Sequence, residues 1–427
     1  MKSEAYFIKN ARIFDPTLGL DQVGDVLLRE GKIEALGAGL KPQGDFKTIE
    51  GKGKVLVPGF VDLHTHLREP GFEHKETVET GTRSAAAGGF TTICCMANTN
   101  PVNDNAAVTE YILNKAREKA SVRVLPIGAI SKGLQGKELA EIGELKQAGC
   151  VGVSDDGMTV MDSQLMRLAM DYARGFDLPV LTHSVDAELA RGAAMHEGEV
   201  SCRLGLKGMP AEAEDIIVAR DIYLSRLTGC RLHVAHVSTL GSVELIRQAK
   251  RAGLPVTGEA APHHFTLTDQ ACEGYDTHAK MCPPLRSEEH RRAVVAGLAD
   301  GTLDCIATDH APHATVDKET EFDQAAFGIL GFETALPLAL RLVEQKAISL
   351  ARMVEALTAK PLAVLRRPYQ GLKVGADADV ALLDLEGLWT YRAAEGFSKS
   401  RNSPFEGWEL KGRAVATWVG GRWVHAL

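Results

Sequence analysis

The sequence has no long hydrophobic run: no stretch reaches the roughly 20 consecutive apolar residues of a membrane-spanning helix. Its first residues, MKSEAYFIKN, also lack the apolar centre of a signal peptide. The usual sequence signals for export and for membrane insertion are therefore missing. We expect a cytoplasmic protein with no membrane partner.

Clusters of positive charge are missing as well. The formal net charge is −8, and no basic run is longer than a few residues. A protein that binds nucleic acid usually presents a dense basic surface. The sequence therefore predicts no nucleic-acid partner.

Paired cysteines are a further absence, because none of the eight cysteines forms a C-x-x-C pair. That spacing is common in zinc ribbons and redox motifs. Most of these cysteines stand in apolar segments, and structural disulfides are rare in a reducing compartment. We expect most of them to be free thiols that pack as small hydrophobic residues.

The middle of the chain contains eight short apolar runs, most of them separated by segments rich in Ala, Leu, Glu and Arg. Near-continuous apolar strands that alternate with amphipathic helices are typical of a parallel sheet covered on both faces. Eight such units over roughly 300 residues favour an α/β fold of the TIM-like (β/α)8 barrel type. An open doubly wound sheet is disfavoured, since no Gly-rich phosphate fingerprint follows the first strand. The eight runs are 60–66, 90–97, 122–129, 149–155, 178–183, 231–237, 255–261 and 304–310.

The two ends of the chain differ from the middle. Segments 5–14, 25–36, 378–385 and 413–424 alternate apolar and polar residues, which predicts short antiparallel strands. Such strands must meet in space to bury their apolar faces. We therefore expect a small β-sandwich domain built from residues 1–57 and 366–427, beside a barrel domain of residues 58–365.

Polar side chains follow the apolar runs at the point where each strand ends. The carboxyl ends of all strands in a parallel barrel open on one face, so these side chains are expected to converge. Imidazole and carboxylate groups in this number suit zinc or a similar divalent metal. The side chains at these strand ends are His64 and His66, Asn98, Asp155 and Asp156, His183, His236, and Asp309 with His310.

Six of these groups exceed the three or four ligands of one zinc ion, which indicates two metals. A carboxylate between two ions would bridge them, and Asp156 is the first candidate, although spacing alone leaves Asp155 open. Two such ions lower the pKa of a shared water and polarise a carbonyl oxygen. Asp309 would then carry a proton between that water and the reacting nitrogen. The sequence predicts a metal-dependent hydrolase.

Arg68 follows His66 by two residues and is expected on the same side of the chain. Its guanidinium group suits a carboxylate, because it can donate two parallel hydrogen bonds. Asn98 and His313 are expected beside it. The predicted substrate is a small anionic amide.

The remaining histidines have other expected roles. His233 is expected to be packed in the core, because it lies on the opposite strand face from His236. For His263 and His264, packing and support of the site are equally compatible with the sequence. Ordinary surface positions are expected for His74, His196, His278, His290 and His425.

These motifs together resemble the amidohydrolase superfamily, and more closely the class I dihydroorotases of the bacterial type. The resemblance spans nearly the whole chain. It is carried by PGFVDLHTHLREPG (58–71), AAAGGFTTICCMANTNP (85–101), SDDG (154–157), VAHVST (234–239), APHHFTLTD (261–269), KMCPPLR (280–286), TDHAPH (308–313) and GLKVGADADVALLD (371–384).

The resemblance implies zinc-dependent, reversible cyclisation of N-carbamoyl-L-aspartate to L-dihydroorotate in pyrimidine synthesis. It implies that His64, His66 and Asp309 bind one zinc, that His183 and His236 bind the second, and that Asp156 bridges them. Asp309 would also be the catalytic acid and base. The implied substrate contacts are Arg68, Asn98, His313, Phe327, Gly328 and the residue at Cys282.

The sequence departs from the resemblance at two places. Many superfamily members bridge their metals with a carbamylated lysine, whereas SDDG supplies a carboxylate here. The family usually has asparagine where this chain has Cys282, and a thiol is a weak hydrogen-bonding group. The contact expected there would then come from the backbone.

Several alternatives concern function and assembly. A hydantoinase or allantoinase shares the expected scaffold, but Arg68 and the MANTNP stretch suit a free substrate carboxylate. An inactive scaffold subunit for aspartate carbamoyltransferase would be expected to have lost metal ligands, and none is missing. A homodimer and a complex with aspartate carbamoyltransferase are both compatible with the sequence. The charged segment 314–328 is expected to close over the bound substrate.

Overall fold

Eight parallel strands form the centre of the computed structural model, which describes residues 4–427. Their order in the sheet follows the sequence, as expected for consecutive strand–helix units. All eight predicted strands are confirmed. They are β6 (Phe60–Thr65), β7 (Phe90–Cys95), β8 (Arg123–Ala129), β9 (Gly152–Ser154), β10 (Val180–Thr182), β13 (Leu232–Val234), β14 (Val256–Ala260) and β15 (Cys305–Ile306).

The sheet closes into a barrel where the end of β6 meets the segment that follows β15. The backbone N–H of His66 donates to the carbonyl oxygen of His310 at 2.9 Å. Parallel bridges also join Thr65 to His310 and His310 to Ile329. The first and last strands therefore pair at the carboxyl end of the barrel, which we call the rim.

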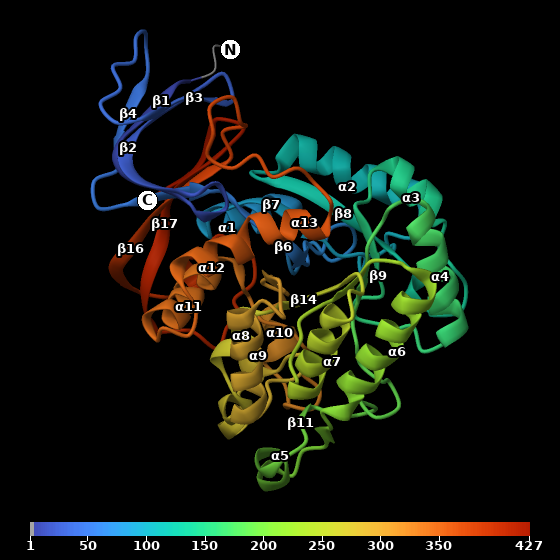
Figure 1. The fold of residues 1–427 in the computed structure, drawn as a ribbon. Helices are drawn as coiled ribbons and strands as arrows, with labels where there is room; N and C mark the ends of the chain where they lie inside the picture. Colours follow the sequence, from blue (N-terminus) through green and yellow to red (C-terminus); the bar gives the residue numbers. More distant parts are fainter. Residues whose placement is uncertain (1–3) are drawn as a thin grey trace.

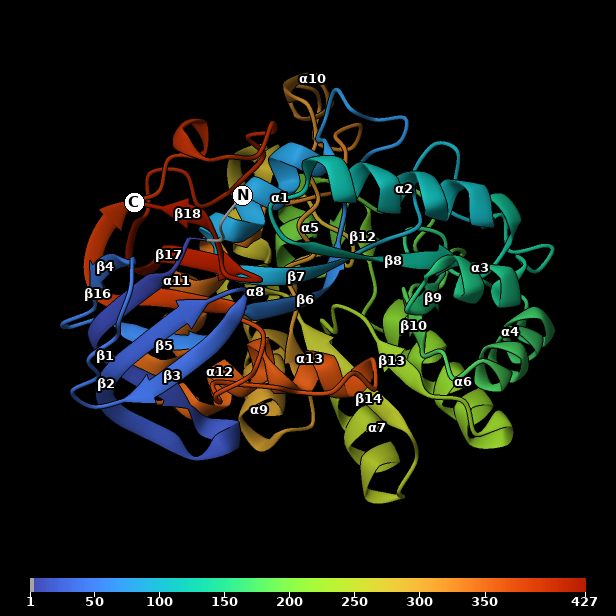
Figure 2. The ribbon, with the colours of Figure 1, turned by 90° about the horizontal axis from the view of Figure 1, so that it is seen from above.

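Helices surround the barrel on its outer face (Figures 1 and 2). The side chains of Thr77, Asn105 and Thr239 cap the first turns of α1, α2 and α7. The longer helices are α1 (Val78–Ala87), α2 (Ala106–Lys119), α3 (Ile142–Ala148), α4 (Ser163–Gly175), α6 (Glu212–Thr228), α7 (Leu240–Arg251), α9 (Glu288–Asp300), α11 (Phe332–Glu344) and α12 (Leu350–Leu357). Short elements are β11 (Met195–His196), α5 (Glu199–Leu204), β12 (Gly208–Met209), α8 (Pro262–Thr266), α10 (Thr315–Lys318) and α13 (Ala359–Val364).

Both ends of the chain build a second sheet, which we call the terminal sheet (Figure 1). Its order is β18-β17-β16-β5-β1-β2-β3, and β4 also pairs with β1. The sheet is mostly antiparallel, as predicted, and β1 also pairs in parallel with β4 and β5, two strands that were not predicted from the sequence. Its strands are β1 (Tyr6–Asp15), β2 (Leu20–Arg29), β3 (Lys32–Gly37), β4 (Lys47–Glu50), β5 (Val55–Pro58), β16 (Val380–Thr390), β17 (Glu409–Val419) and β18 (Arg422–Ala426).

The terminal sheet folds over a core of its own, as a β-sandwich does. Tyr6 of β1 meets Trp418 of β17 and Trp423 of β18, with ring centroids 6.0 and 5.6 Å apart, although β1 is not hydrogen-bonded to either strand. Buried Ile8, Ile13 and other apolar side chains fill this layer. The predicted division at residues 57/58 and 365/366 stays a proposal.

The inside of the barrel is packed rather than open. Leu63, Cys94, Ile127, Leu181 and Cys305, from five different strands, form one buried cluster there. Such filling keeps the strand ends in fixed positions, because close-packed side chains resist displacement. All eight cysteines are free, and six are buried, which confirms the expectation for most of them. Within residues 4–427, no helix is both long and apolar enough to cross a membrane.

Candidate metal centre and active site

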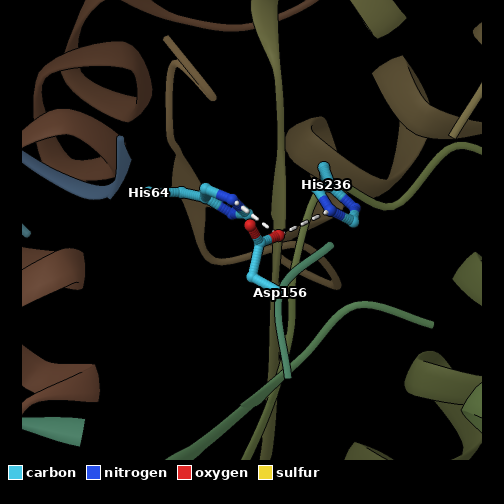
Figure 3. A group of neighbouring side chains, drawn as sticks. All are labelled: His64, Asp156 and His236. Carbon is cyan, nitrogen blue, oxygen red and sulfur yellow. Dashed lines mark ion pairs between the residues drawn. The ribbon is translucent and has the colours of Figure 1, made fainter. Parts of the chain in front are cut away.

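Asp156 lies at the centre of the predicted ligands. It follows β9, and its Oδ1 atom is 3.1 Å from His64 Nε2 and 3.7 Å from His236 Nε2 (Figure 3). Its Oδ2 atom is 3.5 Å from His66 Nε2. Side chains from the ends of β6, β9 and β13, far apart in the sequence, therefore meet around one carboxylate.

Asp309 provides a second carboxylate near the same ring nitrogen of His64. Its Oδ1 atom is 3.1 Å from His66 Nε2 and 3.5 Å from His64 Nε2. Two groups of side chains have the geometry to hold a metal ion: His64 with His66 and Asp309, and His64 with Asp156 and His236. All members of both groups are buried.

His183, at the end of β10, adjoins the second group. Its Nδ1 atom is 3.0 Å from His236 Nε2 and 3.5 Å from Asp156 Oδ1. On its other side, Nε2 lies 3.9 Å from the Cys282 sulfur. The structure thus brings all six predicted ligands together at the rim.

The electrostatics of this cluster favour a bound cation. Burial alone would lower the pKa of His64, but the charges of Asp156 and Asp309 raise it well above its usual value. Burial opposes ionisation of Asp156, yet His64 and His66 hold its pKa well below the usual range. Two buried carboxylates thus draw positive charge between them, and a proton or a metal ion supplies it.

Two imidazole nitrogens of the cluster have no hydrogen-bonding partner among residues 4–427: His64 Nε2 and His236 Nδ1. Buried polar atoms are nearly always hydrogen-bonded, so unpartnered ones need an explanation. His64 Nε2 points at the Asp156 carboxylate without the geometry of a hydrogen bond. Imidazole nitrogens and carboxylate oxygens are the donor set that zinc prefers, and the residues present fit such an ion.

Three residues of the site adopt a left-handed backbone conformation that is uncommon outside glycine. The φ angles are +61° for Arg68, +33° for His236 and +47° for Asp309. Each such residue costs on the order of 1–3 kcal/mol and persists only where the surroundings enforce it. Here the strain turns the side chains that follow the strands toward the mouth of the barrel.

The structure separates the roles of the two neighbouring aspartates. Asp155 points away from the cluster and accepts hydrogen bonds from the backbone N–H groups of Val160 and His183, at 2.8 and 2.9 Å. It therefore shapes the loop, whereas Asp156 faces the histidines. Asp156 and not Asp155 therefore lies beside the histidines, and its role as a bridge between two metals stays a prediction.

Glu259 is a residue of the site that the sequence analysis missed. It lies on β14, and its Oε1 atom is 3.0 Å from His64 Nδ1, while Oε2 is 2.9 Å from His233 Nε2. Burial raises its pKa, but the hydrogen bonds from His233 and His64 outweigh this and lower it to about 2. An acidic residue inside an apolar strand was the signal that could have found it.

His233 is packed, as predicted, and is fully buried. Its ring bridges Thr257 and Glu259, at 2.8 and 2.9 Å. It thereby fixes the carboxylate that in turn orients His64. Partners of this kind set the tautomer and direction of a metal-binding imidazole.

A cavity of about 360 Å³ opens above the cluster. Its walls include five of the predicted substrate contacts: Arg68, Asn98, Cys282, His313 and Phe327. Gly328 adjoins it, and a Cβ atom there would lie 2.6 Å from the Ala311 carbonyl oxygen, at a φ angle of +157°. Only glycine fits this close approach.

Arg68 and His313 form a polar pair in the wall of the cavity. Arg68 Nη2 lies 3.3 Å from His313 Nε2, and its Nε donates to the Pro312 carbonyl oxygen at 3.1 Å. Burial, followed by the charges of Arg68 and Lys75, lowers the pKa of His313 to about 2. A neutral His313 beside a cationic Arg68 suits an anionic group.

Asn98 touches the cluster directly. Its Oδ1 atom is 2.9 Å from His66 Nδ1, and its Nδ2 donates to Asp156 Oδ2 at 3.2 Å. The amide therefore orients one histidine and one carboxylate of the cluster while it also faces the cavity. The sequence predicts that Asn98 lies at the strand ends and contacts substrate, but not that it bonds to His66 and Asp156.

The other histidines divide into two kinds. His263 and His264 are buried but do not line the cavity, and His264 Nε2 hydrogen-bonds to the Pro283 carbonyl oxygen. The surface prediction was wrong for His196 and His425, which are both buried. Burial, with the charges of Arg286 and His290, lowers the pKa of His196 to about 4. Long-range packing of this kind leaves no local sequence signal.

Comparisons with known proteins agree with this geometry. The family model for dihydro-orotase-like proteins matches residues 53–242. The chain is 53% identical to a dihydroorotase of Syntrophotalea carbinolica, covering 98% of this chain and 99% of that one. It is 55% identical to a dihydroorotase of Anaeromyxobacter dehalogenans, covering 99% and 98%. Among solved structures, L-hydantoinase (dihydropyrimidinase) from Arthrobacter aurescens matches with a TM-score of 0.88 and 27% identity, covering 99% and 96%.

The protein is a (β/α)8 barrel with histidines and aspartates at its rim, and an L-hydantoinase is similar to it over the full length. These features define a cyclic amidohydrolase of the amidohydrolase superfamily. The sequence relatives narrow this class. The chain belongs to the dihydroorotase family and is an enzyme of that family. The hydantoinase alternative is not favoured, because the relatives that share half of the sequence are dihydroorotases.

Proposed function

We propose that the chain is a class I dihydroorotase that interconverts N-carbamoyl-L-aspartate and L-dihydroorotate with two zinc ions per subunit. The observation that carries this proposal is the meeting of six potential ligands beneath a cavity that is also lined by Arg68. His64, His66 and Asp309 would hold one ion, and His183 and His236 the other, with Asp156 between them. When bound, the ions would polarise the reacting carbonyl and lower the pKa of a water.

Arg68 and His313 would bind the free carboxylate of the substrate. The guanidinium of Arg68 is held by the Pro312 carbonyl oxygen, which leaves its remaining N–H groups for an anion. Asn98 and the backbone near Gly328 would contact the ring. Cys282 borders the cavity, where its weak thiol leaves the polar contact to the backbone.

Asp309 would move the proton. In ring opening, it accepts a proton from the attacking water and delivers it to the ring nitrogen as the C–N bond breaks. In ring closure, it would take the proton from the ureido nitrogen as that nitrogen attacks the carbon of the protonated side-chain carboxyl group, and return it to the hydroxyl group, which leaves as water as the C–O bond breaks. Fixed groups in a buried site serve both directions without solvent reorganisation.

Turnover of the purified chain tests this proposal. The isolated protein is assayed with N-carbamoyl-aspartate, dihydroorotate, hydantoin and allantoin, before and after zinc is added, and its zinc content is measured. We expect turnover of the first two compounds only, and about two zinc ions per chain. Hydantoin or allantoin as the best substrate would contradict the assignment, and a zinc-loaded but inactive chain would point to a scaffold subunit.

Assembly and location remain predictions. A homodimer, or a complex with aspartate carbamoyltransferase, would appear as a defined mass in light scattering of the chain alone and mixed with that enzyme. The cytoplasmic location predicted from the sequence would be tested by fractionation of cells.

A further inference from the structure

Residues 398–402 lie between β16 and β17 and belong by sequence to the predicted terminal domain, yet they contact the barrel. We call them the clamp segment. Its Ser398 hydroxyl and Lys399 N–H both donate to Glu76, which is fully buried. Ser400 donates to the Lys75 carbonyl oxygen at 2.6 Å. The segment is therefore fastened to the loop that carries Arg68 from β6 to α1.

Asn402 fastens the same segment to the loop that follows the last strand, β15. Its Nδ2 donates to the carbonyl oxygens of Ala311 and Gly328, at 2.9 and 3.0 Å. Its Oδ1 accepts the backbone N–H of His313 at 2.9 Å. The Asn402 side chain is only 1% exposed and does not line the active-site cavity.

These contacts converge on the group that would bind the substrate anion. Asn402 holds the backbone of His313, and Lys75 Nζ lies 3.3 Å from the His313 ring. Arg68 in turn is bound to Pro312 and His313. A segment remote in sequence thus sets the distance between the loops that follow the first and the last strands.

We propose that Asn402 is a positioning residue, which places His313, Gly328 and, through them, Arg68 for the substrate carboxylate. The amide is suited to this task, because it satisfies two carbonyl oxygens and one N–H group at once. The inference rests on the proposed function, since it concerns the same cavity. It assigns no contact between Asn402 and the substrate.

Removal of the amide should weaken substrate binding more than chemistry. In Asn402→Ala, we expect the KM for dihydroorotate to rise at least tenfold, kcat to fall less than threefold, and the zinc content to stay unchanged. An interaction that binds substrate and transition state alike changes KM alone. A KM within twofold of the parent chain in a folded variant would overturn the proposal.

Ser225→Ala is the matched control, because Ser225 is also fully buried and its hydroxyl donates to a backbone carbonyl, that of Cys230, at 2.7 Å. This bond lies at the opposite end of the barrel, before β13. The control should lose thermal stability while its KM stays within twofold. Equal increases of KM in both variants would mean general loosening and would also overturn the proposal.

Hydrogen exchange separates this inference from the proposed function. In Asn402→Ala, the amides of peptides that contain Arg68 and Gly328 should exchange at least tenfold faster, whereas Ser225→Ala should leave them unchanged. If the parent chain fails to turn over dihydroorotate, the proposed function fails, and exchange at Arg68 and Gly328 alone decides the positioning role. If Asn402→Ala does not fold, Ser400→Ala is the alternative variant, because it removes only the hydrogen bond to the Lys75 carbonyl oxygen. In that variant we expect a threefold rise in the KM for dihydroorotate or in the exchange rate of the same amides.

Discussion

At the amino end of the barrel, a cavity of about 250 Å³ lies against the terminal sheet and is lined by Arg123, Asp377 and Asp379, among others. Here Arg123 and both aspartates are paired: Arg123 Nε lies 2.8 Å from Asp379, and Lys32 Nζ lies 2.6 Å from Asp377. At the rim, charged side chains also line the cavity above the cluster of histidines and aspartates, among them Arg68, Asp156 and Asp309. There the carboxylates face imidazoles that crowd one another and leave nitrogens unpartnered.

The difference shows how the pairing of charged groups distinguishes a structural cavity from a functional one. Ion pairs that satisfy each other hold two elements together and need nothing further. Buried carboxylates and imidazoles that converge and leave ring nitrogens without hydrogen-bonding partners are incomplete, and a metal ion would complete them. We therefore expect the charged residues at the amino end of the barrel to contribute to stability and those at the rim to contribute to catalysis. Variants at both ends test this difference.

The largest effect is expected from Asp156→Ala, since Asp156 faces all four histidines of the cluster. We expect kcat/KM to fall by at least about 10³-fold, the scale of losing groups that stabilise charge in the transition state. Metal analysis should show a loss of bound zinc. Asp379→Ala, the matched aspartate at the amino end, should keep kcat/KM within twofold, and an equal loss in both would abolish the contrast between the two ends.

Removal of metal should act almost as strongly, on stability as well as on activity. Dialysis against a chelator should abolish turnover, and zinc should restore it. An ion that binds only the folded chain stabilises it by roughly 4 kcal/mol at a thousandfold excess over its dissociation constant. Thermal melts with and without zinc measure this, and a melting temperature indifferent to the metal would show that the cluster is complete without it.

The fold was largely predictable because each barrel strand has a recognisable pattern in its own short segment of sequence. Eight apolar runs became eight strands, since a strand buried on both faces must be apolar. The parallel partners β4 and β5 were missed: they are four residues each, and β4 carries no continuous apolar pattern. Pairing between distant segments leaves little trace in either one.

The candidate site was predictable where a residue ends a strand, as with His64, His183 and Asp309. Glu259 and Asn402 escaped, because their roles depend on partners far away in the sequence. Glu259 lies within a strand and meets His64 across the barrel, and Asn402 reaches the rim from the terminal region. Residues that position other residues, such as Glu259 and Asn402, do not form a recognisable sequence motif.

Glu259→Gln is expected to lower the metal affinity of the cluster at the rim without removing any of the predicted ligands. The amide keeps the shape of the side chain but removes the charge that orients His64. Loss of such a partner typically lowers metal affinity 10–100-fold, and competition with a zinc indicator measures it. Glu333→Gln is the control: Glu333 is a largely buried acid bound to Ser84 and Phe397, away from the cavity. Unchanged affinity in Glu259→Gln would remove Glu259 from the site.

The smallest effect is expected at the amino end, from the pair Arg123 and Asp379. Their side chains are 46% and 21% exposed, so water screens the attraction between them. A double-mutant cycle of Arg123→Ala and Asp379→Ala in urea unfolding should give a coupling free energy of at most about 1 kcal/mol. All three variants should retain the zinc content and kcat/KM of the parent chain. A tenfold loss of activity in the Arg123 variant would mean that the amino end takes part in the reaction, and paired charges would then no longer distinguish a structural cavity from a functional one.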